Sequence, residues 1–213
     1  MPMETLLQRQ THHQYLYNAL ADEYKKRAMN TLVHDQLIEK AQTLKSVVSG
    51  NQALEIGVGG WQMNKCLHDV GFETSGIDIA DQMIENAKCL NPSGHFFVGD
   101  YLKTSMNKQY DLVAALAFIH LFEQDEAHEI LLKIYHDLAQ NGVLHLTTTK
   151  EDHYEYAKIA KGDYWDSYLR YRARHTPESF IWLLDGTGFV FEHIATEDGV
   201  DGKQRMSLIA RKK

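Results

Sequence analysis

The run Leu54-Glu55-Ile56-Gly57-Val58-Gly59-Gly60-Trp61 decides how this 213-residue chain folds. It joins a strand-like apolar segment, an acid and a glycine-rich turn, and the pattern of a helix follows. In open α/β sheets ligands bind beyond the carboxyl ends of the strands, where such a turn lies. Glycine lets a ligand approach the backbone closely, but a tight turn that only requires glycine has the same local sequence. The rest of the chain has to distinguish these two interpretations.

Strand-like and helix-like stretches alternate from Gln52 onward. Such alternation predicts a parallel sheet with helical crossovers. The Asn141-Gly142 pair is interpreted as the stop of the helix that precedes the fifth strand. The expected elements are strand 52–58, helix 63–70, strand 74–79, helix 82–90, strand 95–100, strand 110–118, a helix with the apolar stripe Ala127, Ile130, Leu131, Ile134 and Leu138, and strand 142–149.

The C-terminal part predicts one more helix and two more strands. Thr176 is a suitable N-cap and Pro177 a suitable first helical residue. The strand candidates 189–196 and 206–212 are expected to form a hairpin. The predicted fold class is therefore α/β: a doubly wound, Rossmann-like, mostly parallel sheet of about seven strands, with a C-terminal antiparallel hairpin, N-terminal helices and a small cap.

The chain is expected to form one domain, because it contains no repeat, low-complexity run or Pro/Gly/Ser linker. Residues 1–50 are expected to be N-terminal helices and a lid: one helix from about His12 to Arg27, then a helix whose apolar stripe packs on the sheet. Residues 51–149 are the expected core, 150–175 a cap, and 176–213 the last helix and strands. The stripe consists of Val33, Leu37, Ala41, Leu44 and Val48.

Composition limits the partners. A formal net charge of −7 and a pI near 5.9 disfavour nucleic acid, which is bound by dense Lys and Arg surfaces. A small-molecule partner is expected, with a monomer and a homodimer left open. Cys66 and Cys89 lack the spacing of a disulfide scaffold or a zinc site, and no run of 18 apolar residues suits a membrane span. A cytoplasmic location is the resulting expectation.

Two further acids stand at the ends of the next two strands, namely Asp78 and Asp100. Each acid alone is more typical of a strand end or helix cap than of a ligand contact. Together with Glu55 they place three carboxylates at one edge of a parallel sheet. An acid at the second strand end suits ribose hydroxyls, and one at the third suits an adenine amino group. Ile79 and Tyr101 are expected to bracket the adenine ring.

With these motifs in order, the sequence resembles the class I S-adenosylmethionine-dependent methyltransferases from about Gln52 to the C-terminus. The resemblance is carried by LEIGVGG, GIDIADQMIENAK, FFVGDY, YDLVAALAFIHLF and NGVLHLTTT. It implies S-adenosylmethionine as cofactor and S-adenosylhomocysteine as product. Carried over by position, the resemblance implies that Glu55, Gly57 and Gly59 hold the methionine part, Asp78 the ribose, and Asp100 and Tyr101 the adenine. The other expected cofactor-binding residues are Gly60, Ile79 and Ala117.

The cofactor's chemistry agrees with this resemblance. S-adenosylmethionine has an ammonium and a sulfonium but no phosphate, so an acid such as Glu55 suits it better than a pyrophosphate. Gln62 stands where a dinucleotide fingerprint has its third glycine. Trp61 departs from the family, which often has a small residue there. An NAD(P)-dependent oxidoreductase and a non-catalytic S-adenosylmethionine-binding module remain as alternatives.

Methyl transfer from a sulfonium is an in-line displacement, so the protein mainly aligns the reacting atoms. The expected reaction is transfer to an O or N atom of a small molecule. His120, just after the fourth strand, is the candidate base, with a packed histidine as the equal alternative. No metal site is predicted, since no HExxH pattern occurs. Candidates for the substrate wall are Tyr17, Tyr24, Trp165, Tyr168, Arg172 and Arg174.

Overall fold

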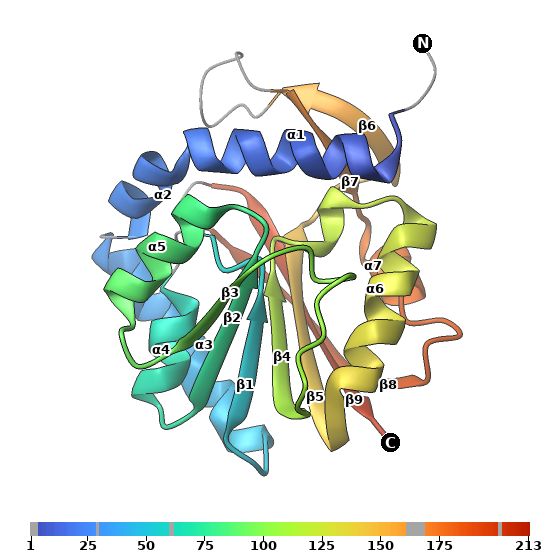
Figure 1. The fold of residues 1–213 in the computed structure, drawn as a ribbon. Helices are drawn as coiled ribbons and strands as arrows, with labels where there is room; N and C mark the ends of the chain where they lie inside the picture. Colours follow the sequence, from blue (N-terminus) through green and yellow to red (C-terminus); the bar gives the residue numbers. More distant parts are fainter. Residues whose placement is uncertain (1–3, 29, 60–61, 161–168, 200–201) are drawn as a thin grey trace.

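A seven-stranded sheet forms the centre of the molecule, in the order β3-β2-β1-β4-β5-β9-β8 (Figure 1). The computed structural model describes residues 4–28, 30–59, 62–160, 169–199 and 202–213. The first five strands are parallel, and β9 runs antiparallel between β5 and β8. The predicted α/β class and its C-terminal antiparallel hairpin are thus confirmed. The strands are β1 Gln52–Ile56, β2 Glu73–Asp78, β3 His95–Val98, β4 Tyr110–Leu116, β5 Leu138–Thr149, β8 Phe189–Asp198 and β9 Gln204–Lys212.

Helices cover both faces of this sheet, because its central strands are apolar on both sides. On one face pack α3 (Thr31–Val47) and α4 (Met63–Asp69), and α3 buries Ala41, Leu44 and Val48 of the predicted stripe. The other face carries α6 (Gln124–Asp137) and α7 (Pro177–Trp182). The side of α5 (Asp81–Leu90) that bears Ile84 and Ala87 packs beside β3.

The predicted start of α7 is confirmed, while the predicted end of α6 is wrong. Thr176 caps α7 by accepting a hydrogen bond from Ser179 N at 3.2 Å. The helix α6 ends at Asp137, before the Asn141-Gly142 pair, and β5 begins at Leu138. Leu138 is fully buried and pairs with Tyr110 of β4. Asn141 instead adopts a positive φ of 62° inside the strand, where the β4–β5 register shifts, so it marks a bulge rather than a helix stop.

The N-terminal segment forms two helices where one was expected from about His12 to Arg27. They are α1 (Leu6–Ala19) and α2 (Ala21–Ala28), separated at Leu20. Thr5 and Gln8 form a capping box at the start of α1. The helix then lies across the carboxyl ends of the parallel strands (Figure 1). It reaches from α5 at one side of the sheet to Glu126 of α6 at the other, which Arg9 contacts.

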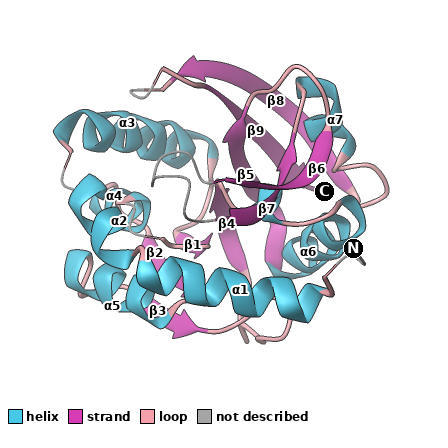
Figure 2. Ribbon diagram, turned by 90° about the horizontal axis from the view of Figure 1, so that it is seen from above, coloured by secondary structure: helices cyan, strands magenta, loops and turns pink. Residues whose placement is uncertain are grey.

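A small antiparallel sheet stands apart from the main one, in the segment predicted to be a cap. It consists of β6 (Glu155–Ala160) and β7 (Leu169–Arg174). Seen from above, α1 and this pair of strands cover the end of the sheet at which β1 to β5 finish (Figure 2).

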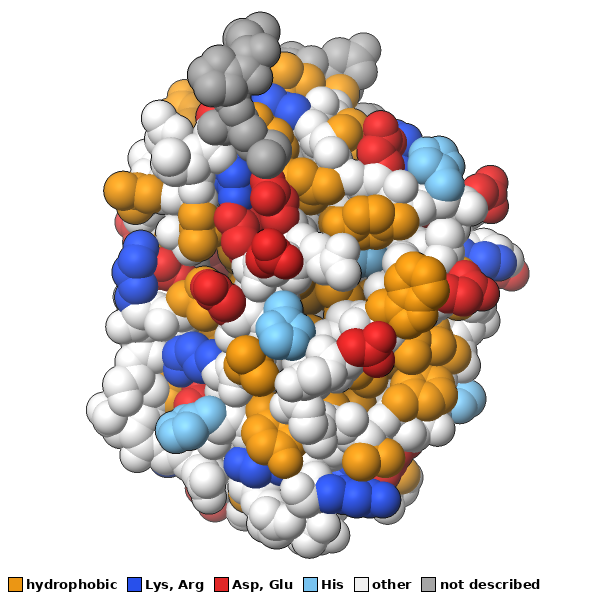
Figure 3. All heavy atoms as spheres, turned by 90° about the vertical axis from the view of Figure 1, so that its right-hand side faces the viewer, with side chains coloured by type: hydrophobic (Ala, Val, Ile, Leu, Met, Phe, Trp, Pro, Cys, Tyr) orange, Lys and Arg blue, Asp and Glu red, His pale blue; other side chains and the backbone are white. Residues whose placement is uncertain are grey.

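The surface agrees with a chain of net negative charge. On the side that carries α6 and α7, acidic, basic and apolar side chains are interspersed, and the Lys and Arg side chains drawn there form no continuous patch (Figure 3). Within the described residues, no helix combines the length and apolar character that crossing a membrane requires.

Candidate functional site

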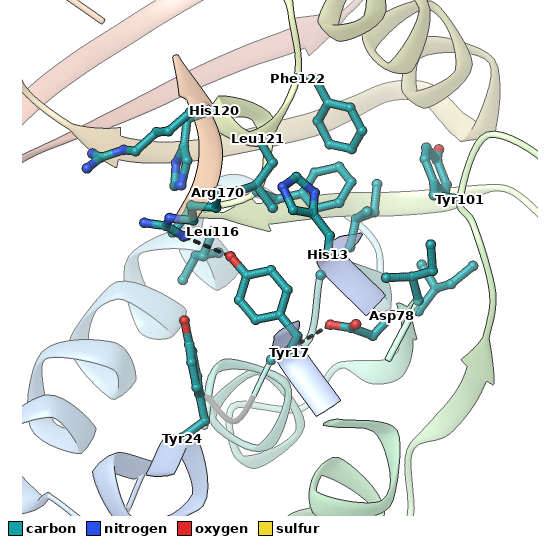
Figure 4. Close-up of a pocket in the computed structure, with 18 of the residues that line it drawn as sticks. His13, Tyr17, Tyr24, Asp78, Tyr101, Leu116, His120, Leu121, Phe122 and Arg170 are labelled. Carbon is teal, nitrogen blue, oxygen red and sulfur yellow. Dashed lines mark hydrogen bonds between the residues drawn. The ribbon is translucent and has the colours of Figure 1, made fainter. Parts of the chain in front are cut away.

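A cavity of about 500 Å³ lies between the carboxyl ends of the parallel strands and the covering elements α1 and β7 (Figure 4). Its volume lies within the usual range for small-molecule sites. Of the predicted site residues, Glu55 and Arg174 are not part of its wall, and Gly60, Trp165 and Tyr168 lie outside the described residues. The wall contains Tyr17, Tyr24, Gly57, Gly59, Asp78, Ile79, Asp100, Tyr101, Ala117, His120 and Arg172.

The glycine loop after β1 needs its glycines for geometry. Gly57 and Gly59 have φ angles of 70° and 53°, in the left-handed region that glycine adopts at least cost. A Cβ on Gly57 would stand 2.7 Å from Cδ2 of Phe118. The loop is therefore fixed against the segment after β4, and it exposes backbone to the cavity.

Asp78 connects this loop to the end of β2. Its Oδ2 accepts a hydrogen bond from Gly59 N at 3.0 Å and its Oδ1 one from Ala80 N at 2.9 Å. A carboxylate has about four acceptor positions, so each oxygen keeps capacity for another donor. Burial raises the pKa of Asp78 to about 6, although the two amides oppose that rise. Its environment suits a ligand that supplies further hydroxyl donors.

Glu55 lies behind the loop rather than in the cavity wall. It is 1% exposed, and neither carboxylate oxygen has a hydrogen-bond partner among the described residues. Burial, and next the charge of Asp78, raise the pKa of Glu55 well above its usual range, while Asn64 opposes the shift. No cation within the described ranges is among the groups that shift this pKa, and a buried charge without a partner is costly. A cation bound against the loop would reduce this cost without touching Glu55.

Asp100 and Tyr101 line the cavity beyond β3, but their polar atoms are partly engaged elsewhere. Asp100 Oδ1 accepts from Leu102 N at 3.1 Å, and Oδ2 lies 3.0 Å from Lys103 Nζ. The Tyr101 hydroxyl donates to Asp137 Oδ2 at 2.8 Å, away from the cavity. Burial, then the charge of Asp137, raise the pKa of Tyr101. Only the ring of Tyr101 is therefore available to flank a ligand.

The segment after β4 is strained where it passes the cavity. Ala117 has a φ of 51°, and its nitrogen donates to the carbonyl of Thr147 at 3.0 Å. A non-glycine residue in this region costs free energy, and such strain clusters at functional sites. The next turn, η1 (Ile119–Leu121), places His120 in the wall at 3% exposure. The His120 Nδ1 lies 3.3 Å from Thr148 Oγ1, which orients the ring.

The helix α1 contributes side chains to the wall, among them Tyr17, which the sequence predicted, and His13, which it did not. His13 and Tyr17, one turn apart, both point into the cavity (Figure 4). His13 is 5% exposed, and its Nε2 has no hydrogen-bond partner among the described residues. Burial, and next His12, lower the pKa of His13 to about 4, so the ring is neutral at physiological pH.

The strand β7 closes the cavity at the side opposite Asp78. Arg170 Nη1 donates to the Tyr17 hydroxyl at 2.8 Å, and this bond joins β7 to α1 across the cavity (Figure 4). Arg172 also lines the wall. Arg174 instead pairs with Glu155 of β6 at 2.9 Å and does not reach the cavity.

Several wall residues were not predicted from the sequence. No pattern of neighbouring residues shows where the elements that carry them lie relative to the sheet. In the sequence, His13 is not distinguishable from any other polar residue of a helix. The one signal that could have found Arg170 is the alternation Arg170-x-Arg172-x-Arg174, which puts three cations on one strand face. The residues missed include Gln10, His13, Phe118, Leu121, Phe122, Arg170, Lys203 and Arg205.

Comparison with known proteins identifies the family. Residues 54–146 match the model of a methyltransferase domain. An uncharacterized methyltransferase of Alkaliphilus oremlandii (strain OhILAs) is 30% identical over 155 residues, which are 67% of this chain and 71% of that protein. The chain is a class I S-adenosylmethionine-dependent methyltransferase.

Solved structures of methyltransferases share the fold. One is the 1,6-didemethyltoxoflavin-N1-methyltransferase of Burkholderia thailandensis, with a TM-score of 0.78 and 13% identity over 100% of this chain and 92% of that one. Another is the magnesium protoporphyrin IX methyltransferase of Synechocystis PCC 6803, with a TM-score of 0.72 and 15% identity over 99% of this chain and 100% of the other. At these identities the likeness concerns the fold.

The methyltransferase binds S-adenosylmethionine and releases S-adenosylhomocysteine. The cavity fits this group on two counts. Asp78 keeps free acceptor capacity at the edge of the sheet where a ribose would lie, and the uncompensated Glu55 favours a cationic group at the loop. Because the chain belongs to this family, the alternative of an NAD(P)-dependent oxidoreductase, which the sequence left open, is excluded. Among the described residues, no group of three or more His, Cys, Asp or Glu side chains could hold a metal ion.

Proposed function

We propose that this methyltransferase transfers the methyl group of S-adenosylmethionine to an O or N atom of a small molecule held under α1 and β7. The observation that carries the proposal is one continuous cavity. Its wall extends from Gly57 and Asp78 at the strand ends to His13, Tyr17 and Arg172 in the cover. A covered cavity of about 500 Å³ suits a small acceptor beside the cofactor rather than a polymer.

The cofactor residues in this proposal are those at the strand ends. Gly57 and Gly59 leave backbone accessible to the methionine part, Asp78 accepts from the ribose hydroxyls, and Asp100 with the Tyr101 ring flanks the adenine. A cation bound at the loop favours the ionised form of Glu55, which then acts on the ligand through its field and not by contact. S-adenosylmethionine supplies the electrophilic methyl group when bound, and the protein supplies alignment and exclusion of water.

Two imidazoles are candidates for receiving the acceptor's proton. His120 follows β4 and has its Nδ1 near Thr148 Oγ1, which leaves Nε2 as the nitrogen toward the cavity. His13 enters from α1 and is neutral at working pH, with its Nε2 unpartnered among the described residues. We favour His120 as the base, because burial lowers the pKa of His13 to about 4, and so weak a base accepts protons poorly near neutrality.

The experiment is a methyl-transfer assay that detects S-adenosylhomocysteine with a panel of phenols, amines and N-heterocycles. We compare His120→Gln with His13→Gln, and use His136→Gln as control because the His136 side chain is 88% exposed. A base role predicts that His120→Gln lowers kcat about 100-fold while the affinity for S-adenosylhomocysteine is retained. Equal turnover of His120→Gln and the control removes the base role. Cofactor binding without transfer to any panel member contradicts the small-acceptor proposal.

The proposal includes a reducing, cytoplasmic location. Cys66 is buried and Cys89 exposed, and both are free thiols. Free thiols of this kind are typical of a reducing compartment.

A further inference from the structure

The cavity wall is electrically asymmetric. Two acids line it, Asp78 and Asp100, and both stand at the strand ends. The cationic side chains in the wall come from α2, from β7 and from the start of β9 with the residue before it. They are Arg27, Arg170, Arg172, Lys203 and Arg205, so among the described residues five cations and two acids line the cavity of a chain whose net charge is −7. Charge of one sign in a low-dielectric cleft focuses the field on a ligand of opposite sign.

The pairing of β6 with β7 explains why two of these cations face the cavity. Alternate residues of β7 lie on one face, so the three arginines project together. Across the ladder, Arg174 stands opposite Glu155 and makes an ion pair with it. Arg172 stands opposite Ala157, and Arg170 stands opposite Ile159. In the register of this ladder, the arginine outside the cavity thus stands opposite an acid, and the two that line the cavity stand opposite apolar residues.

Arg172 is in an unfavourable position when the cavity holds no anion. Its side chain is 12% exposed, and within the described part of the chain it pairs with Glu151, with 3.7 Å between Nη2 and Oε1. That separation exceeds the usual length of a charge-assisted hydrogen bond. Arg172 Nε is buried and has no hydrogen-bond partner among the described residues. Burial, and next the charge of Arg170, lower the pKa of Arg172.

Resting on the proposed function, we propose that Arg170 and Arg172 form a binding site for an anionic group of the methyl acceptor, either a carboxylate or a phosphate. A guanidinium offers paired donors that match both groups. Bound S-adenosylmethionine carries more positive than negative charge, so it strengthens the preference for an anionic acceptor. Tyr17 assists by holding Arg170 through its hydroxyl.

The competing assignment is that these arginines bind the carboxylate of the cofactor itself. The two assignments differ in which affinity depends on Arg172. If the arginine serves the acceptor, its loss weakens anion binding to the S-adenosylhomocysteine complex and leaves cofactor affinity unchanged. If it serves the cofactor, its loss weakens S-adenosylhomocysteine binding first.

The test titrates benzoate, phenyl phosphate and uncharged benzamide into the protein saturated with S-adenosylhomocysteine. The Nε–H signals of Arg170 and Arg172 are followed by nuclear magnetic resonance, and cofactor affinity is measured separately by calorimetry. Arg172→Met removes the charge and Arg172→Lys keeps it. Arg174→Met is the matched control, because Arg174 lies on the same strand face outside the cavity.

We expect the Arg172 signal to shift with benzoate, phenyl phosphate or both, and the anion that binds more tightly distinguishes carboxylate from phosphate. Benzamide should bind at least about tenfold more weakly, Arg172→Met should lose about tenfold in anion affinity, and Arg172→Lys should lose less. The proposal is overturned if neither anion shifts the Arg172 signal at about 10 mM. It is also overturned if Arg172→Met and Arg174→Met lose equal affinity for the anion. A loss of S-adenosylhomocysteine affinity in Arg172→Met as large as its loss for the anion overturns it as well. A wild-type protein that does not bind S-adenosylhomocysteine contradicts the proposed function instead.

Discussion

Asp78 Oδ2 and Gly59 N are joined by a hydrogen bond of 3.0 Å, so the acid at the end of β2 holds the glycine loop that follows β1. Two motifs that are 19 positions apart in the sequence thus form one structural unit. The same carboxylate faces the cavity, so a change in its protonation affects both the loop and the ligand.

Cofactor affinity should depend on pH through Asp78. Its pKa is raised to about 6, so the carboxyl is ionised above that pH and protonated below it. Only the ionised form accepts from Gly59 N and from ribose hydroxyls together, so affinity is retained above about pH 6 and falls below it, by up to about tenfold per pH unit. Calorimetric titration of S-adenosylhomocysteine between pH 5 and pH 8 measures this. Asp78→Asn should bind weakly at every pH, and a persistent fall below pH 6 in that variant would assign the effect to another group.

Gly57→Ala should impair the loop more than an equivalent change at Gly71. Both glycines have positive φ, 70° and 93°, so alanine costs about 1–2 kcal/mol of backbone strain at either position. Only at Gly57 would the new Cβ meet Phe118, at 2.7 Å, whereas nothing lies within 4 Å at Gly71. We expect the larger loss of stability in urea unfolding, and a loss of S-adenosylhomocysteine affinity, for Gly57→Ala alone. Equal behaviour of the two variants would show that the Phe118 contact is unimportant.

Tyr101→Phe should reduce stability with little effect on the cofactor. The hydroxyl donates to Asp137 in the protein interior, and its removal costs about 1–2 kcal/mol of unfolding free energy. The ring, which faces the cavity, is unchanged. Unfolding in urea and a binding titration give the two quantities. A large drop in S-adenosylhomocysteine affinity would mean that the hydroxyl turns toward the ligand in the complex.

Arg9→Met should loosen α1. Arg9 is 4% exposed and pairs with Glu126 of α6, with Glu123 at 3.6 Å. Loss of one partner leaves buried acids uncompensated, at a cost of about 2–3 kcal/mol after allowance for the partial exposure of both acids. The exposed pair of Lys26 with Glu23 is the control, and Lys26→Met should change stability by less than about 0.5 kcal/mol. Hydrogen exchange in α1 should rise only in Arg9→Met, and equal protection in both variants would refute the anchoring role.

The sequence predicted the parts of the molecule with local signals and missed those made by long-range packing. Thr176-Pro177 marks a helix start by its own chemistry, and Asp78 and Asp100 lie at strand ends that the hydrophobic pattern identifies. The Asn141-Gly142 pair led to a wrong prediction of where α6 ends, because such turn residues occur at a bulge in a strand as well as at the end of a helix. His13 reaches the cavity only through the path of α1 over the sheet, which no nearby residue specifies.

The position of α1 also affects how the reaction cycle runs. Besides the Arg9 pair, exposed polar contacts hold α1 and the residue Glu4 before it: Lys158 Nζ with Glu4 at 2.6 Å, His12 with the Leu169 carbonyl at 2.6 Å, and Asn18 with Asp81 at 2.6 Å. Contacts of this exposed kind contribute little free energy each. In the proposed arrangement the spent cofactor lies beneath this helix. We therefore expect α1 to move aside when the product leaves, and this step to limit the rate of turnover once the transfer itself is fast.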